Sequence, residues 1–466
     1  MELTRTTKLA TAMLLVLNLT ACVDDGTDGV NGINGQDGVD GISGVSTFVT
    51  RADVVNTNAN IAYAVYSDSL ISAVALRESL QQLVDAPSAS SFAEAKQAWL
   101  AAREPYGQSE VYRFRSGPID ALKPDGTLGV EGDGPEGRIN AWPLGEAIID
   151  YVAVIVDGDS NPESPANALS NNIIANSDDY SQINKSTLQS LFEYGEDERN
   201  VTTGYHAIEF LLWGQDLNAD KTGSGERDNT GGQRPFSDYY SANNGHESAC
   251  TSGEQAVVDQ TCMRRGDYLL AAADVLIDDL TAIATSWEPN VGVHYNAFVA
   301  GGNVSLAKIL EGMGRLSFGE LAGERINIAL TTDSQEDEHS CFSDNTHRDI
   351  YLNAKGVQNS YNANYIRING EIIQGASIHD LLVVEGFHEL ANQLRGALEQ
   401  TQLNASVIDT HAKTGTPFDV LIQQSVQQPN ILAVINSLVS QTDVIEQVIG
   451  ALGVTTNDLR QDTGEF

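Results

Sequence analysis

Basic residues are scarce in this chain of 466 residues. Lysine and arginine together number 26, against 64 aspartate and glutamate residues, and the formal net charge is −38. Binding of nucleic acid requires a basic surface that neutralises phosphates, so this class of function is excluded. The acidity fits either attraction of cations or a solvated surface suited to salty surroundings. The second explanation is favoured, because net charge alone locates no site.

Cysteine is also rare, with four residues at positions 22, 250, 262 and 341. Outside the reducing cytosol, Cys250 and Cys262 are the natural disulfide pair, because they flank a short polar loop. Closing a loop of this size contributes on the order of 3 kcal/mol to stability. Cys341 is then left over, and the sequence does not decide between a buried thiol, a reactive thiol and a soft metal ligand.

The N-terminus lacks an apolar run of membrane-spanning length. The run from Leu9 to Leu19 has about half of the roughly 20 residues that a spanning helix needs. With the basic residues before it, the run predicts a signal peptide over residues 1–21. Leu19-Thr20-Ala21-Cys22 resembles a bacterial lipobox, which implies lipid attachment to Cys22, and Val23 is compatible with sorting to an outer membrane. The alternative is an ordinary signal peptide with an incidental cysteine.

Period-two strand patterns are scarce, and the prolines fall mostly between segments of helical periodicity. We therefore predict an all-α fold with two helical-bundle halves resembling four-helix bundles, at residues 54–215 and 259–455. A connecting loop at 216–258 separates them. Polar stretches at 116–141, 214–258 and 331–364 are predicted loops. Glycine recurs at every third position over residues 26–44, which predicts a flexible collagen-like tether within residues 22–53.

The standard hydrolase signatures are missing. His246-Glu247 and His388-Glu389 begin a His-Glu-x-x-His pattern, but Cys250 and Asn392 stand where the second histidine belongs. The sequence has no nucleophile elbow and no phosphate-binding loop. A peptidase of the common zinc type is therefore not indicated.

One apolar segment contains an imidazole and a carboxylate at helical spacing. In Gly204-Tyr205-His206-Ala207-Ile208-Glu209, the residues His206 and Glu209 are three apart and share a helix face. A buried carboxylate must be paired, protonated or bound to a cation. The pair therefore predicts either a metal site or an internal hydrogen bond that satisfies a core, and spacing alone does not choose between them.

Further ligands must come from other segments. Glu110 lies among aromatic residues near the end of a predicted helix, where it faces inward or pairs with Arg113. The loop at 335–347 concentrates carboxylates, two imidazoles and the Cys341 thiol, all of them metal-binding groups. A solvated acidic loop is the competing interpretation.

Several separated segments together resemble the imelysin family, and especially its branch of iron-regulated protein A. The resemblance spans roughly residues 55–450 and rests on the motif Gly204-x-His206-x-x-Glu209, on residues 112–120, on residues 140–144, on residues 312–316 and on residues 340–347. It implies two helical domains, an envelope lipoprotein, a metal site at the Gly-x-His-x-x-Glu motif between the domains and a link to iron acquisition. The peptidase label of the family is less secure, because its fold is unlike known zincins.

The resulting hypothesis is a metal-binding lipoprotein of the cell envelope, anchored by lipid in the outer membrane. Its cargo is a divalent or ferric ion, with iron favoured and zinc as the alternative, or an iron chelate passed to envelope iron-transport components. A metal-dependent peptidase and a surface adhesion or scaffold module are the rival functions. The predicted ligands are His206, Glu209, Glu110 and Asp344, with Arg103, Ser340 and His347 supporting them.

Overall fold

Helix α1 (Arg51–Asp85) carries one side of the core. In the computed structural model, which describes residues 48–153, 172–218, 227–423 and 428–460, this helix starts at a capping box between Thr50 and Asp53. Its apolar residues recur every three or four positions, as predicted, and Tyr66, Leu76 and Leu80 are fully buried. By composition α1 is apolar enough to cross a membrane, but 56% of its most apolar window is buried inside the protein.

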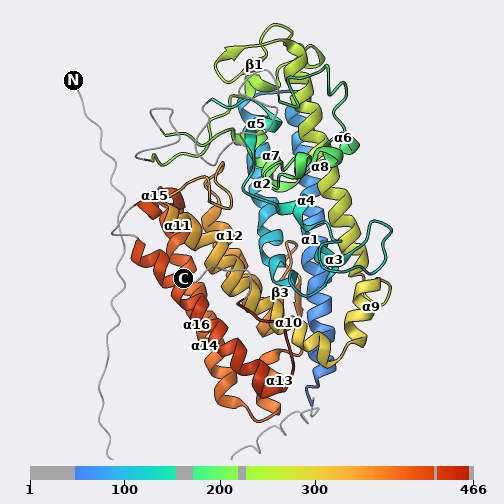
Figure 1. Cartoon of the computed structure of the whole chain (residues 1–466), viewed down its shortest axis with the longest axis vertical. Coiled ribbons are helices and arrows are strands. Elements are labelled where there is room, and N and C mark those ends of the chain that lie inside the picture. Colours follow the sequence, from blue (N-terminus) through green and yellow to red (C-terminus); the bar gives the residue numbers. More distant parts are fainter. Residues whose placement is uncertain (1–47, 154–171, 219–226, 424–427, 461–466) are drawn as a thin grey trace, which may run out of the picture. The chain divides into compact units, whose positions relative to one another are not determined.

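Two long helices pack beside α1. They are α2 (Ala89–Ser109) and α8 (Asp259–Ser286), and Figure 1 shows the three running side by side. Ser88 caps the start of α2 and forms a capping box with Ser91, the third residue of the helix. Helix α2 continues through Pro105 to Ser109, and a single 3-10 turn follows at Glu110–Tyr112.

Short helices connect α2 to α8. They are α3 (Pro118–Ala121), α4 (Glu136–Asn140), α5 (Glu146–Ile149), α6 (Lys185–Leu191) and α7 (Gly204–Trp213), with 3-10 turns at Tyr194–Glu196, Phe236–Tyr239 and Ala242–Asn244. Residues 116–141 and 214–258 of this region were predicted as loop. The helices range from four residues in α3 to ten in α7.

The remaining chain is again helical. It contains α9 (Val293–Ala300), α10 (Asn303–Arg315), a π-helical segment η5 (Leu316–Asn327), α11 (Ile328–Thr332), α12 (Thr346–Asn362), α13 (Ile378–Val384), α14 (His388–Lys413), α15 (Phe418–Gln423) and α16 (Gln428–Leu452). Helix α14 packs on α16 and on α12, and α12 packs on α2.

Within the described residues, the strands form two antiparallel hairpins. Strands β1 (Thr251–Ser252) and β2 (Gln255–Ala256) pair Thr251 with Ala256, and a disulfide joins Cys250 to Cys262 around this hairpin. Strands β3 (Asn364–Ile366) and β4 (Ile372–Gln374) pair Tyr365 with Ile373. The prediction of an all-α fold is confirmed, since the rest of the regular structure is helical.

Helix α12 is the longest helix that the prediction missed, because residues 331–364 were expected to form a loop. The helix buries Asp349, Asn353 and Ser360 together with Ile350 and Val357. Polar residues on the buried face interrupt the apolar periodicity by which an amphipathic helix is recognised. One of them, Asp349, is part of the site described below.

The predicted signal peptide at residues 1–21, the lipidation site Cys22 and the glycine repeat at 26–44 lie outside the described residues. The predicted boundary between two bundles at 216–258 stays a prediction.

Candidate functional site

Helix α7 presents His206 and Glu209 on one face in the interior. Every residue of the helix is buried. Gly204 at its start has a φ of +85°, and a Cβ added there would lie 2.5 Å from the carbonyl oxygen of Ile139 in α4. The motif glycine therefore allows the start of α7 to contact α4, which fixes the direction in which His206 points.

His206 and Glu209 contact each other directly. The Nδ1 atom of His206 lies 2.9 Å from Oε2 of Glu209, and Ser343 donates to the other oxygen, Oε1, from its backbone N–H at 3.0 Å and its hydroxyl at 2.6 Å. Burial raises the pKa of Glu209 to about 8. Burial and the neighbouring ring of His339 hold the pKa of His206 well below its usual value. Glu209 thus fixes the orientation of the His206 ring.

A second imidazole–carboxylate pair faces the first. Nδ1 of His339 lies 2.8 Å from Oδ2 of Asp349, and Arg103 donates to Oδ1 of Asp349 at 2.9 Å. Burial raises the pKa of Asp349, but Arg103 and His339 outweigh burial and hold that pKa well below its usual value. The rings of His206 and His339 meet edge to face, with centroids 4.8 Å apart.

Asn140 connects this pair to Glu110. Its side-chain N–H₂ group lies 3.2 Å from Nε2 of His339 and 3.2 Å from a carboxylate oxygen of Glu110. Arg325 donates to the other oxygen of Glu110 at 2.6 Å, and Arg113 lies 3.5 Å from it. Burial raises the pKa of Glu110, but Arg325 and Arg113 outweigh burial, so that the pKa is lowered. The carboxylate of Glu110 is therefore held in an ion pair.

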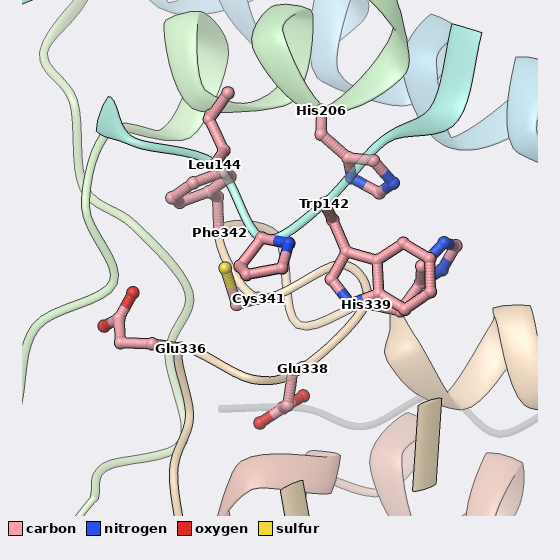
Figure 2. Close-up of a pocket in the computed structure, with 9 residues that line it drawn as sticks. Trp142, Leu144, His206, Glu336, Glu338, His339, Cys341 and Phe342 are labelled. Atoms are coloured by element: carbon pink, nitrogen blue, oxygen red, sulfur yellow. The ribbon is translucent and has the colours of Figure 1, made fainter. Parts of the chain in front are cut away.

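A small cavity lies beside His206. Its volume is about 10 Å³, room for one water molecule or one ion. Nε2 of His206 is buried and makes no hydrogen bond, although its residue lines this cavity. Figure 2 shows the lining residues: Trp142, Pro143, Leu144, His206, Glu336, Glu338, His339, Cys341 and Phe342. The thiol of Cys341 is buried, and burial raises its pKa well above the usual value.

Asp344 lies in a different cluster from His206. Among the described residues, Asp216, Asp344 and Asp419 are the group of three metal-binding side chains close enough to share one ion, with oxygen atoms within 4.8 Å of one another. Nδ1 of His347 lies 2.8 Å from the carbonyl oxygen of Asp344, and its Nε2 lies 3.8 Å from Asp409. The structure therefore does not bring the four predicted ligands together: His206 contacts Glu209, whereas Glu110 and Asp344 belong to other networks.

The predicted supporting residues also belong to more than one hydrogen-bond network. Arg103 and Ser340 both donate to Asp349, which holds the ring of His339. Sequence reasoning considered the whole 335–347 loop but selected His347, and it missed the contribution of His339 and Asp349. These two residues are ten positions apart, across a loop and a helix start, so no periodic pattern relates them.

Comparison with known proteins places the chain in a family. The family model for imelysin, which carries a peptidase label, matches residues 62–445. The chain belongs to the imelysin family. A search of curated protein sequences found no significant match. The predicted motif at Gly204, His206 and Glu209 lies within the matched residues.

Two solved structures share the fold. A protein from Parabacteroides distasonis ATCC 8503, described as an iron-regulated protein A precursor, is 15% identical with a TM-score of 0.56, and the match covers 86% of this chain and 94% of that one. An imelysin-like protein from Psychrobacter arcticum 273-4 is 13% identical with a TM-score of 0.53, over 87% of this chain and 98% of that one. At these identities the likeness establishes a shared fold.

Proposed function

We propose that the chain is a metal-binding lipoprotein of the cell envelope that handles iron, with His206 as the imidazole ligand of the ion. One observation carries the proposal: the buried Nε2 atom of His206 has no hydrogen-bond partner, and its residue lines a cavity of about 10 Å³. A buried nitrogen without a partner is costly, and a bound ion would offset that cost.

The surroundings of His206 fit a metal ligand. A histidine that binds metal through one ring nitrogen usually donates its other N–H to a carboxylate, which fixes the tautomer. Glu209 is in position to accept that proton from Nδ1, and Ser343 holds Glu209 in place. Binding at Nε2 requires the imidazole proton to be on Nδ1 and Glu209 to be ionised, and a cation at Nε2 favours the ionised carboxylate.

Nearby positive charges do not oppose this function. Arg103 and Arg325 both lower the pKa of His206. Each is paired with a buried carboxylate, Arg103 with Asp349 at 2.9 Å and Arg325 with Glu110 at 2.6 Å. A cation at Nε2 of His206 therefore faces neutralised arginines.

Iron is the favoured cargo. The structurally similar protein from Parabacteroides distasonis is described as an iron-regulated protein A precursor. Imidazole and carboxylate groups bind iron and also zinc, so the donors alone do not separate the two metals. Zinc is the comparison ion in the test below.

Attachment to the envelope rests on the N-terminal sequence. The signal-like residues 1–21 end in a lipobox-like tetrapeptide with Cys22. Several acyl chains on one cysteine anchor a protein stably, and envelope components that transport iron would then receive the cargo. The peptidase alternative lacks a supporting observation of its own among the described residues.

The test measures iron binding by the full chain after removal of metal. We expect ferrous iron to bind by titration calorimetry under anaerobic conditions, and His206→Gln to abolish most of this binding. Loss of a supporting group such as Glu209 typically costs about 10–100-fold in affinity, so Glu209→Gln is expected in that range.

The matched control is His294→Gln. His294 is also a buried histidine, but Ser286 contacts its Nδ1 at 2.8 Å and the backbone of Ala121 bonds its ring as well. His294→Gln should bind iron as the wild type does. Equal iron binding by the His206→Gln protein and the wild type contradicts the proposal, and tighter zinc than iron binding contradicts the choice of metal.

A further inference from the structure

Three aspartates from distant parts of the sequence meet at one point. Asp216 follows α7, Asp344 lies in the loop before α12, and Asp419 is the second residue of α15. One oxygen of each lies within 4.8 Å of the corresponding oxygens of the other two. Asp216 and Asp419 are buried and Asp344 is partly buried. Like charges this close repel each other unless a proton or a cation lies among them.

Buried oxygen atoms without partners point to a missing cation. Asp419 is 3% exposed, and its Oδ1 atom accepts no hydrogen bond. Glu338 is 2% exposed, and neither of its carboxylate oxygens has a partner of acceptable geometry. Figure 2 shows the Glu338 side chain pointing away from His206. After burial, the charges of Asp419 and Asp344 are the main influences that raise the pKa of Glu338 well above its usual value, so Glu338 adds to the negative charge of this region.

The local charge is strongly negative. Asp228 and Glu336 add to the repulsion felt by Asp216. The positive charge of Arg227 acts on Asp419 and on Glu338. Its guanidinium, however, donates hydrogen bonds to Asp333 and to the backbone oxygen of Asp419. One arginine does not balance this number of carboxylates, and an unpaired buried carboxylate costs several kcal/mol.

We propose that Asp216, Asp344 and Asp419 bind a hard divalent cation of the calcium class. Calcium takes oxygen ligands at about 2.3–2.6 Å, so two ligands on opposite sides of one ion are about 4.6–5.2 Å apart. Oxygens that all lie within 4.8 Å of one another suit that span. Carboxylates without imidazole or thiolate ligands favour calcium over iron(II) or zinc. The site does not rest on the proposed function, because neither His206 nor Glu209 belongs to it.

The test uses calcium chloride as the probe and the full chain after removal of metal. Titration calorimetry measures the affinity, and thermal unfolding followed by circular dichroism measures the change in melting temperature. The test variant is Asp216→Asn/Asp419→Asn, which keeps the side-chain shapes. The control variant is Asp125→Asn/Asp178→Asn, which removes the same charge from two exposed positions. The His206→Gln protein is included to separate the two sites.

We expect the wild type, the control variant and His206→Gln to bind one calcium ion with equal affinity and to melt at a higher temperature with calcium. The test variant should bind roughly 100-fold more weakly, since two ligand charges are lost. Without calcium, it should melt at a higher temperature than the wild type, because the repulsion is relieved. Absence of calcium binding by the wild type at about 10 mM, or unchanged affinity in the folded test variant, overturns the proposal.

Discussion

At the scale of single residues, Gly204 shows why the motif needs more than a histidine and a glutamate. Its φ is +85°, in the left-handed region that favours glycine. A Cβ atom there would lie 2.5 Å from the carbonyl oxygen of Ile139 and 2.7 Å from that of Arg138. Both obstacles are backbone atoms of α4, which cannot rotate away as a side chain can. Glycine is therefore required for α7 to start where it does.

Gly204→Ala should destabilise the protein by more than about 2 kcal/mol, because it combines an unfavourable φ with a backbone clash. The matched control is Gly396→Ala in the exposed middle of α14, where an added Cβ meets nothing within 4 Å. That change should stabilise the protein by roughly 0.5–1 kcal/mol, since alanine favours the helix. Urea unfolding of both variants measures the difference, and equal effects would show that the contact with α4 is not rigid.

Sequence spacing predicted part of the residue-scale site. Three positions on a helix place His206 next to Glu209, and the structure has them 2.9 Å apart. Sequence spacing could not select His339, whose ring packs on His206, because the direction of this ring depends on the turns of the 335–347 loop. Asp344 was assigned to the His206 site for its chemistry, whereas the fold places it with Asp216 and Asp419. Local patterns identify residues on one helix face, and the contacts between segments come from the tertiary fold.

At the scale of elements, the π-helical segment Leu316–Asn327 brings an arginine to Glu110. A π-helix bonds residue i to residue i+5, so residues five apart come close to each other. Glu320 and Arg325 are five apart, and Arg325 donates to Glu320 at 2.8 Å and to Glu110 at 2.6 Å. The chain stays helical through this segment, with a wider turn.

Arg325→Met should destabilise the protein by about 3–5 kcal/mol, because it leaves Glu110 buried without its main partner. Glu110→Gln removes that charge, and the combination Glu110→Gln/Arg325→Met should therefore lose less stability than the sum of the two single variants. Urea unfolding of the wild type and the three variants gives the interaction energy between the residues, expected at about 1–3 kcal/mol. Additive losses would mean that Arg113, 3.5 Å from Glu110, neutralises it alone.

At the scale of the whole molecule, helix α8 packs on helices from the other side of the segment at residues 216–258. Helix α8 follows that segment, yet it packs extensively on α1 and α7 and also contacts α3, α4 and α6, all of which precede it. Its buried residues include Tyr268, Leu276 and Ile283. The helical class was predictable from periodicity, whereas the partner of each apolar face was not, because one amphipathic helix offers much the same face to any neighbour.

A fragment of residues 259–455, the predicted C-terminal bundle, should therefore fail to fold alone, because α8 loses the surfaces that bury its apolar face. We expect this fragment to unfold without a cooperative thermal transition, whereas residues 48–460 unfold cooperatively. Circular dichroism during heating and the exposure of apolar surface to a hydrophobic dye measure both properties. The matched control mixes the fragment with residues 48–258, which supply α1 and α7, and should restore the cooperative transition. A cooperative transition of residues 259–455 alone would show instead that the segment at 216–258 joins two independent bundles and that the packing of α8 on α1 is an interface between domains.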